Sequence, residues 1–225
     1  MRHLVSTSIA GASWLLLVCS GSPAAERQVA GELPEIAGFY LPSSIELQKF
    51  SLVDHRGRAF TKRDLTGRWT LVTFGYTHCP DVCPTTLAGL REVRRQLVAR
   101  RSPIDPVILF VTIDPQRDTT GRLDQYVSAF GQGVRGVGGS AADIAAFAAQ
   151  FRVQYAKSGG ARADAYFMDH TSSVALLAPD ASLRAVFSVP LRPERVATDL
   201  DRIRIANLRV AGSSGAPVPR GKFAY

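Results

Sequence analysis

Two cysteines, Cys79 and Cys83, stand four positions apart in the segment FGYTHCPDVCPTTLAGL, and a proline follows each of them. Residues four apart on a helix share a face, with Cβ atoms about 5–6 Å apart. A disulfide requires about 3.5–4.5 Å between these atoms. Because the segment runs from a predicted strand into a predicted helix, distortion at the helix start could close that gap. The pair can therefore form a disulfide or hold a metal ion between two sulfur atoms.

We expect both thiols to lie at a helix N-terminus, where unpaired N–H groups and the helix dipole lower a thiol pKa and favour the thiolate. The thiolate is the form that attacks a disulfide and the form that binds a metal. A purely structural disulfide is the alternative, but a bridge that closes so short a loop removes little entropy from the unfolded chain. The sequence therefore favours redox or metal chemistry for Cys79 and Cys83.

Four histidines are candidates for a third ligand. His3 lies near the N-terminus, and His55 lies in a predicted hairpin turn, where we expect it to be exposed. His78 adjoins the first cysteine and should point elsewhere. His170, in FMDHTSS just before a predicted strand, is the candidate ligand, although a lone histidine often has a structural role. Two thiolates with one imidazole suit copper, because soft sulfur favours Cu(I) and imidazole accommodates Cu(II). Zinc accepts such ligands but commonly takes a fourth.

The segments around the cysteines have the pattern of an α/β domain. The β-branched and aromatic run over 69–76 predicts a buried central strand, and 106–113 predicts a second. Helical periodicity predicts a helix after Pro84 and another over 118–130, and Ser140 opens a third with a capping-box-like start. A short strand or loop is expected at 134–137.

The remaining elements complete the predicted fold. Alternation over 45–61, on both sides of a turn at 54–57, predicts a hairpin. Strand pairs are predicted at 152–156 with 165–168 and at 173–178 with 183–189, and Pro193 opens the last helix. A cysteine pair on the turn from a central strand into a helix is typical of a thioredoxin-like arrangement. We therefore predict an α/β, thioredoxin-like fold, with a central mixed sheet flanked by helices, an extra N-terminal hairpin and an inserted β-hairpin.

The N-terminal segment predicts that the protein is exported. A charged start, the apolar residues 4–19 and the small residues after them are typical of a secretory signal over 1–25. A lipid on Cys19 and an uncleaved anchor are the alternatives. Residues 26–43 are interpreted as a linker, 44–210 as the domain and 211–225 as a disordered tail. Each alternative predicts a periplasmic protein, either free or tethered to the inner membrane, in an oxidising compartment.

Composition excludes some classes of function. Hydrophobic content of 46% and charged content of 20% are typical of a globular protein. The net charge of +8 comes mostly from scattered arginines, with no basic run interleaved with aromatic residues. We therefore expect no nucleic-acid binding and interpret the basic balance as a solvated surface.

Three motifs together resemble the SCO/SenC family of copper-binding, thioredoxin-fold proteins. They are FGYTHCPDVCPTTL, TIDPQRDT at 112–119 and YFMDHTSSVALLAPD at 166–180. The resemblance covers about 45–208. It implies that Cys79, Cys83 and His170 bind copper, as Cu(I) or Cu(II), and that Asp114 supports the metal site.

The resemblance also implies a function and partners. The family helps to deliver copper to the copper-site subunit of a respiratory cytochrome c oxidase, so periplasmic copper donors or thiol reductants are expected as further partners. The alternative is a thiol–disulfide oxidoreductase, which keeps the copper-site cysteines of the oxidase reduced or acts in redox signalling. This alternative needs both cysteines but not His170. A peroxidase-like function has only the analogy of fold behind it. Enzymatic turnover beyond thiol–disulfide exchange is not expected.

The two charged residues that follow in the second motif have expected structural roles. Arg117 and Asp118 should shape the loop after the second central strand and cap the helix that comes next.

Overall fold

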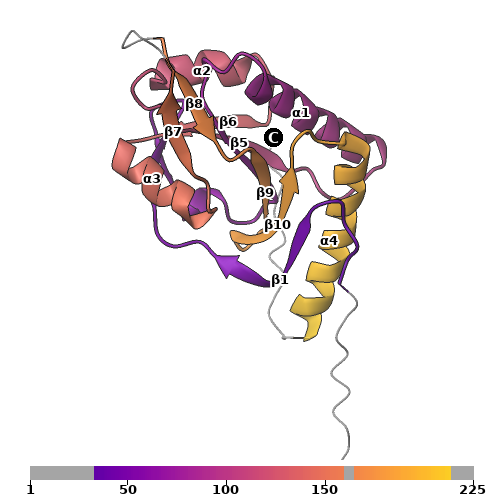
Figure 1. Cartoon of the computed structure of the whole chain (residues 1–225). Coiled ribbons are helices and arrows are strands. Elements are labelled where there is room, and N and C mark those ends of the chain that lie inside the picture. The colour runs from indigo at the N-terminus through magenta and orange to yellow at the C-terminus, as the bar shows by residue number, and fades with distance from the viewer. Residues whose placement is uncertain (1–32, 160–164, 214–225) are drawn as a thin grey trace, which may run out of the picture. The chain divides into compact units, whose positions relative to one another are not determined.

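A mixed eight-stranded sheet forms the centre of the computed structural model, which describes residues 33–159 and 165–213 (Figure 1). The strand order is β1-β10-β9-β4-β5-β6-β2-β3. Strands β4, β5 and β6 are parallel, and the other pairs are antiparallel. The strands are β1 (Phe39–Glu46), β2 (Ser51–Asp54), β3 (Ala59–Thr61), β4 (Thr70–Gly75), β5 (Val107–Thr112), β6 (Val134–Gly138), β9 (Ser173–Leu177) and β10 (Ser182–Ser188). The predicted signal segment lies outside the described residues.

Helices cover the sheet on both sides, as predicted. Helices α1 and α4 lie together on one side of the sheet and α3 lies on the other (Figure 1). The helices are η1 (Lys62–Asp64), α1 (Val82–Ala99), α2 (Thr120–Ser128), α3 (Ala141–Gln150) and α4 (Pro193–Ser213). The inserted hairpin is also confirmed, because β7 (Tyr155–Ser158) and β8 (Phe167–His170) form a separate two-stranded sheet. Within the described ranges, no helix has both the length and the apolar character to span a membrane.

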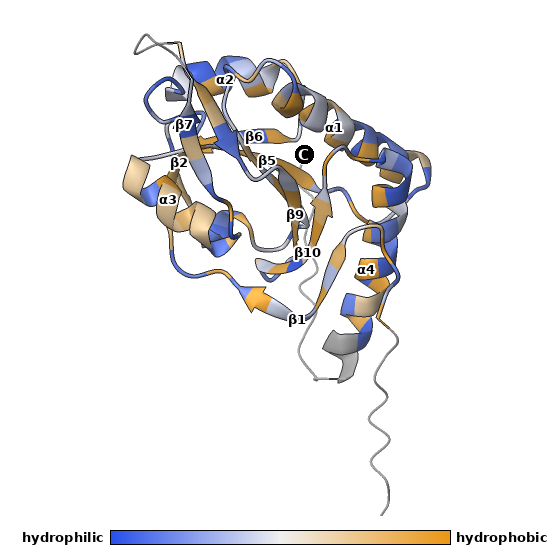
Figure 2. Cartoon of the chain, in the orientation of Figure 1, coloured by the Kyte–Doolittle hydropathy of each residue, from blue (hydrophilic) through white to orange (hydrophobic). Residues whose placement is uncertain are grey.

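The core explains why these elements form. All six residues of β4 are buried, as expected for a strand with helices on both faces. Helix α1 buries one stripe of apolar side chains against the sheet, and the hydropathy colours of Figure 2 show the same division between inner and outer faces.

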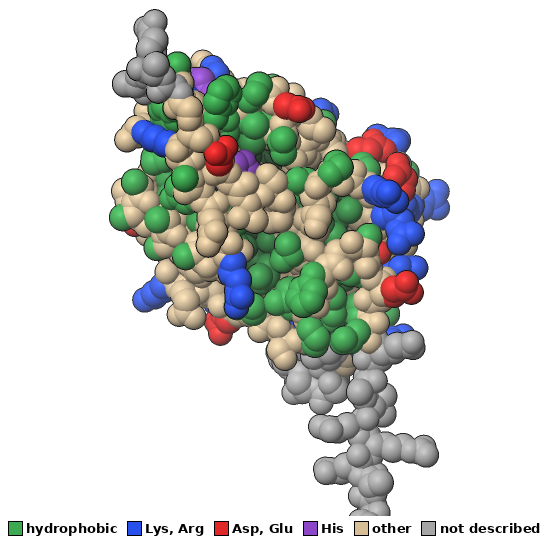
Figure 3. Space-filling view, in the orientation of Figure 1, with side chains coloured by type: hydrophobic (Ala, Val, Ile, Leu, Met, Phe, Trp, Pro, Cys, Tyr) green, Lys and Arg blue, Asp and Glu red, His purple; other side chains and the backbone are tan. Residues whose placement is uncertain are grey.

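On the face seen in Figure 3, basic and acidic side chains gather together beside α1. In α1, Arg95 pairs with Glu92, and Arg94 pairs with Asp105.

The predicted boundaries were wrong at the N-terminal side. Residues 39–43, interpreted as linker, belong to β1, which pairs with β10 at the sheet edge. The N-terminal hairpin is therefore only β2–β3, and Ile45 pairs with Leu183 instead of entering that hairpin. The helix expected after Pro84 begins earlier, at Val82. Pro84 is tolerated in the first turn of this helix, because a backbone N–H at that position would have no partner within the helix. Helix α4 ends at Ser213, beyond the predicted end of the domain.

His55 was wrongly predicted to be exposed, since only 8% of the residue is accessible. Its Nδ1 lies 3.2–3.3 Å from the backbone of Gly136, and its Nε2 lies 3.8 Å from Asp124. Gly136 has no side chain, and a Cβ added there would lie 3.5 Å from the Cβ of His55. The β2–β3 turn therefore packs closely over β6, and this long-range contact leaves no local trace in the sequence.

Asp54 directly precedes His55, and its environment predicts that the fold loses stability at acid pH. Burial would raise the pKa of Asp54, but hydrogen bonds from Arg58 and Arg56 outweigh burial and lower it from 3.8 to about 2. Because the folded-state pKa is depressed, the stabilisation is complete above pH about 4 and is lost as the pH falls through about 2. It amounts to about 2 kcal/mol. Urea unfolding of wild type and Asp54→Asn should show this pH dependence in wild type only. The same acid dependence in both proteins would contradict the assignment.

Candidate metal centre

The connection from β4 to α1 brings the two cysteines together. The Cys79 backbone N–H donates to the Tyr76 carbonyl at 3.1 Å, which turns the chain just before the helix. The Cys83 backbone N–H then donates to Cys79 Sγ at 3.4 Å, so the first sulfur accepts a bond from the first turn of α1. Cys79 is half-buried, whereas Cys83 is 4% exposed. Both thiols are free. The two sulfurs are therefore close but not bonded to each other, and one is accessible whereas the other is enclosed.

The electrostatics of the second thiol differ from the prediction. Burial raises the pKa of the Cys83 thiol well above its usual range, and the neighbouring Cys79 side chain raises it further. The expected lowering by the helix N-terminus was therefore wrong for Cys83, because the loss of water around the enclosed sulfur outweighs the helix dipole. Cys83 keeps its proton in the metal-free protein. A metal ion that binds both sulfurs must displace that proton.

Gly75, the last residue of β4, makes the space for the enclosed sulfur. A Cβ at this position would lie 2.7 Å from Cys83 Sγ and 2.9 Å from a ring carbon of Phe110. We expect Gly75→Ala to displace the sulfur and to destabilise the fold by about 1–3 kcal/mol, the usual cost of overpacking a core. Gly121→Ala is the control, since a Cβ there meets nothing within 4 Å. Urea denaturation and thiol titration would measure both variants, and equal stability of the two would contradict this packing.

A buried carboxylate fixes the chain that leads to the first cysteine. Asp118 accepts hydrogen bonds from the Thr77 N–H at 2.9 Å, the Thr77 hydroxyl at 2.6 Å and the Thr112 hydroxyl at 2.6 Å. It thereby ties the loop after β4 to the end of β5. The prediction that Asp118 shapes the loop is confirmed, but it does not cap α2, because the Thr119 hydroxyl accepts the Arg122 N–H.

His170 lies at the end of β8, opposite Tyr155 of β7. Its Nδ1 lies 3.0 Å from the Thr171 carbonyl oxygen. Among the described residues, no three or more His, Cys, Asp or Glu side chains are grouped closely enough to hold a metal ion. The structure thus brings Cys79 and Cys83 together but does not join His170 to them. His78 is exposed, with its Nδ1 3.2 Å from the Thr77 hydroxyl.

Asp114 connects the loop after β5 to the strand that carries His170. Its side chain is buried and accepts hydrogen bonds from the Tyr166 hydroxyl at 2.7 Å and from the Arg117 guanidinium. Arg117 also donates to the Tyr166 carbonyl at 3.0 Å and lies over the Tyr166 ring, 3.6 Å from its centroid. Tyr166 immediately precedes β8. Asp114 therefore acts on the position of the β7–β8 hairpin.

Tyr76 links this hairpin to the cysteine pair. Burial raises the pKa of the Tyr76 phenol, a hydrogen bond with the Met168 backbone lowers it, and the two nearby cysteines raise it. The phenol therefore lies within electrostatic reach of both sulfurs and contacts β8. Met168 and His170 are two apart on one strand, so their side chains point to the same face. His170 therefore lies about 7 Å along the strand from Met168, the residue that Tyr76 contacts.

Comparison with known proteins gives the family. The family model SCO1/SenC matches residues 41–204. The chain belongs to the SCO1/SenC family. The mitochondrial SCO2 homolog of Bos taurus is 36% identical over 208 residues, which are 92% of this chain and 74% of that protein. The human SCO2 homolog is 41% identical over 133 residues, so this chain spans about half of that relative, 49%.

A solved SCO structure confirms the fold. The copper-bound structure of ScoI from Bradyrhizobium japonicum is 37% identical, with a TM-score of 0.62 over 70% of this chain and 99% of that one. The predicted family and the thioredoxin-like α/β fold are thereby confirmed.

Sequence reasoning missed two aromatic residues of the candidate site. Tyr76 and Tyr166 were interpreted only as parts of strands, yet they connect the cysteine pair, Asp114 and β8. Tyr76 lies close to Cys79 in the sequence, and Tyr166 lies close to His170, which was the signal that could have found them. Nothing in the sequence pattern showed which way their hydroxyl groups point.

Proposed function

We propose that this protein is a copper metallochaperone that delivers copper to a respiratory cytochrome c oxidase during its assembly. One observation carries the proposal: a chain 37% identical to a copper-bound ScoI holds Cys79 and Cys83 side by side as free thiols. Thiolate sulfur is the ligand type that selects Cu(I). Family membership supports the oxidase as the destination of the metal.

His170 is the proposed third ligand, and Asp114 its proposed support. The imidazole would complete a site of two sulfurs and one nitrogen, which accommodates Cu(I) and Cu(II). Such a site leaves a coordination position through which a ligand of the acceptor protein can enter. Cys83 is enclosed and Cys79 is more accessible, so a ligand of the acceptor protein would reach the metal from the side of Cys79.

A shift of the β7–β8 hairpin would bring His170 to the sulfurs. The hairpin is a separate two-stranded sheet, and such sheets have little stability of their own. Its position depends on the contacts of Tyr166 with Asp114 and Arg117 and of Met168 with Tyr76. Copper would therefore bind to a hairpin already held close to the cysteine pair.

This arrangement predicts that Tyr166 affects copper affinity although it is not a ligand. We expect Tyr166→Phe to weaken copper binding by about tenfold, because loss of the hydroxyl frees the hairpin from Asp114 without removing a ligand. Tyr155→Phe is the matched control, since Tyr155 lies on the same hairpin and its hydroxyl has no hydrogen bond to a described residue. Competition titrations with a Cu(I) chelator would measure both. Equal affinities in the two variants would remove Asp114 and Tyr166 from the site.

Thiol–disulfide exchange is the second candidate function, favoured by the unequal exposure of the two sulfurs. The accessible Cys79 thiolate would attack a partner disulfide and release one partner thiolate. Cys83 would then give its proton to the partner thiolate released in the first step and attack Cys79 Sγ, which forms the Cys79–Cys83 disulfide and releases the second partner thiolate. Two electrons pass to the partner, so a periplasmic thiol reductant must restore the pair.

Transfer of copper to an acceptor distinguishes the two functions. The reduced chain, loaded with one Cu(I), would be mixed with the metal-free, already reduced copper-binding domain of a cytochrome c oxidase subunit. A chaperone transfers its copper to this acceptor, as measured by metal analysis after separation. An oxidoreductase transfers none, but reduces the same acceptor when that acceptor is supplied as its disulfide. Retention of the copper with no reductase activity would refute both functions.

We also propose that the protein acts on the periplasmic side of the inner membrane. The support is the signal-like sequence over 1–25, which lies outside the described residues. Mass spectrometry of the mature protein tests this proposal and separates its forms. Cleavage after Ala24 or Ala25 indicates a free protein, a lipid on Cys19 or an intact N-terminus indicates a tether, and an intact chain in the cytoplasm would refute export.

A further inference from the structure

A hollow of about 800 Å³ lies at the end of the sheet opposite to the cysteine pair. Its lining includes Arg68, just before β4, and the first residues of β5 and β6, Val107 and Val134. These strands are parallel, so the hollow lies at their amino ends, whereas Cys79 follows the carboxyl end of β4. Strand β4 has six residues and is about 20 Å long. The hollow is therefore separate from the candidate metal centre.

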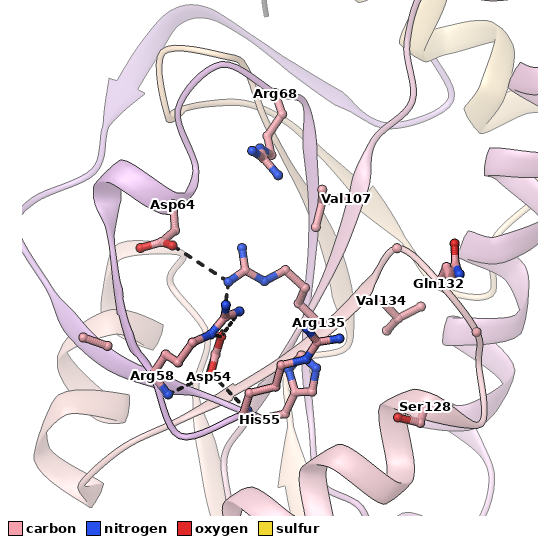
Figure 4. Close-up of a pocket in the computed structure, with 14 residues that line it drawn as sticks. Asp54, His55, Arg58, Asp64, Arg68, Val107, Ser128, Gln132, Val134 and Arg135 are labelled. Atoms are coloured by element: carbon pink, nitrogen blue, oxygen red, sulfur yellow. Dashed lines mark hydrogen bonds and ion pairs between the residues drawn. The ribbon is translucent and has the colours of Figure 1, made fainter. Parts of the chain in front are cut away.

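Positive charge dominates this hollow. Its charged lining residues are Arg56, Arg58, Arg68 and Arg135 with Asp54 and Asp64. Figure 4 shows the guanidinium groups of Arg58, Arg68 and Arg135 around one common space, with Asp64 at its border. Within the part of the chain that the structure describes, the side chains of Arg56 and Arg68 have no ion pair or hydrogen bond. Two guanidinium groups are thus left over after the carboxylates are matched.

Two of the arginines are held in place by the protein. Arg58 donates to Asp54 through two nitrogen atoms, at 3.0 and 2.8 Å. Arg135 lies 3.4 Å from Asp54 and 3.8 Å from Asp64, and its guanidinium lies 5.0 Å from the centroid of the Phe60 ring. Asp54 is 1% exposed, so this network is anchored in the core. The geometry of the fixed arginines exists before any ligand arrives, which lowers the entropic cost of binding.

We propose that this hollow binds a phosphate-type oxyanion carrying at least two negative charges. Guanidinium groups match the oxygen geometry of phosphate through paired hydrogen bonds, and the two unmatched arginines balance the charge of a dianion. Ser128 and Gln132 add neutral polar groups to the lining. The volume exceeds that of inorganic phosphate, so the oxyanion belongs to a larger molecule, either a soluble phosphorylated compound or a lipid headgroup with a phosphomonoester. This binding is independent of the copper function.

Pyrophosphate is the probe for this site. Calorimetric titration of the full reduced chain at low ionic strength should show saturable binding. We expect Arg56→Gln with Arg68→Gln to weaken it about 100-fold, about tenfold for each guanidinium group removed. Both side chains are exposed and without partners among the described residues, so the variant should fold. Lys49→Gln with Arg152→Gln is the matched control, because these exposed residues carry the same charge and do not line the hollow.

Flotation with vesicles identifies the source of the oxyanion. Binding to phosphatidic acid vesicles, whose phosphomonoester headgroup can carry two negative charges, but not to phosphatidylcholine vesicles, would assign a lipid headgroup if it depends on Arg56 and Arg68. Pyrophosphate binding without vesicle binding would assign a soluble phosphorylated compound. No saturable pyrophosphate binding, equal weakening in the Lys49 and Arg152 control, or tighter binding of an oligo-aspartate peptide would overturn the proposal.

Discussion

Replacing Cys83 with serine is expected to abolish stable copper binding, with a loss of affinity of about 100-fold or more. Structural zinc sites with four protein ligands bind zinc with about 10–16 kcal/mol, so we take about 3 kcal/mol for one ligand, and 1.4 kcal/mol corresponds to about tenfold. A serine hydroxyl keeps its proton at neutral pH and cannot replace the thiolate. Competition with a Cu(I) chelator measures the loss, and an oxidase assembly assay in cells should show the same deficiency.

Substitution of Cys79, the half-buried cysteine of the pair, provides the control for folding. Cys83 is buried, with its sulfur packed beside Gly75, so serine at this position also disturbs packing. Cys79→Ser changes a more accessible side chain and should lose copper to the same extent while its thermal unfolding stays close to that of wild type. If Cys79→Ser keeps wild-type copper affinity, the two-sulfur site is refuted, whatever the effect of Cys83→Ser.

His170→Ala should lower copper affinity by about 100-fold and remove the nitrogen contribution from the EPR spectrum of the Cu(II) form. The cysteine pair should keep its capacity for thiol–disulfide exchange, because that chemistry needs only the two sulfurs. His170 has no tertiary hydrogen bond among the described residues, so its removal should leave the fold intact. Chelator competition and EPR measure the metal site, and reduction of a model disulfide measures the thiols.

His78→Ala is the matched control for this prediction. His78 adjoins Cys79 in sequence, is exposed and contacts the Thr77 hydroxyl. We expect its loss to leave copper affinity within about twofold of wild type. A result in which His78→Ala weakens binding and His170→Ala does not would exchange the roles of the two histidines. If His170→Ala loses copper yet restores oxidase assembly fully in cells, the redox function would replace the chaperone function.

The elements that carry the cysteines could be predicted from the sequence because their signals are local. The β4 run is apolar throughout, and α1 repeats its apolar residues at the helical period, so strand, turn and helix were each visible. The two thiols lie on this single connection. Their proximity therefore followed from spacing alone.

The remaining features depend on contacts between distant segments. The pairing of β1 with β10 and the packing of His55 on Gly136 join residues that are far apart in the chain. The raised pKa of Cys83 reflects how completely the core encloses it, which a sequence pattern does not report. The relation of His170 to the sulfurs depends on how Tyr166 and Asp114 hold a separate hairpin. Local periodicity contains no information on that orientation.

X-ray absorption at the copper edge of the loaded wild-type chain tests the central claim most directly, because it counts the ligands bound to the metal. We predict two sulfur ligands and one imidazole nitrogen, with the nitrogen signal absent in His170→Ala and kept in His78→Ala. Two sulfur ligands with an unchanged spectrum in His170→Ala, or a site without two sulfurs, would contradict the claim.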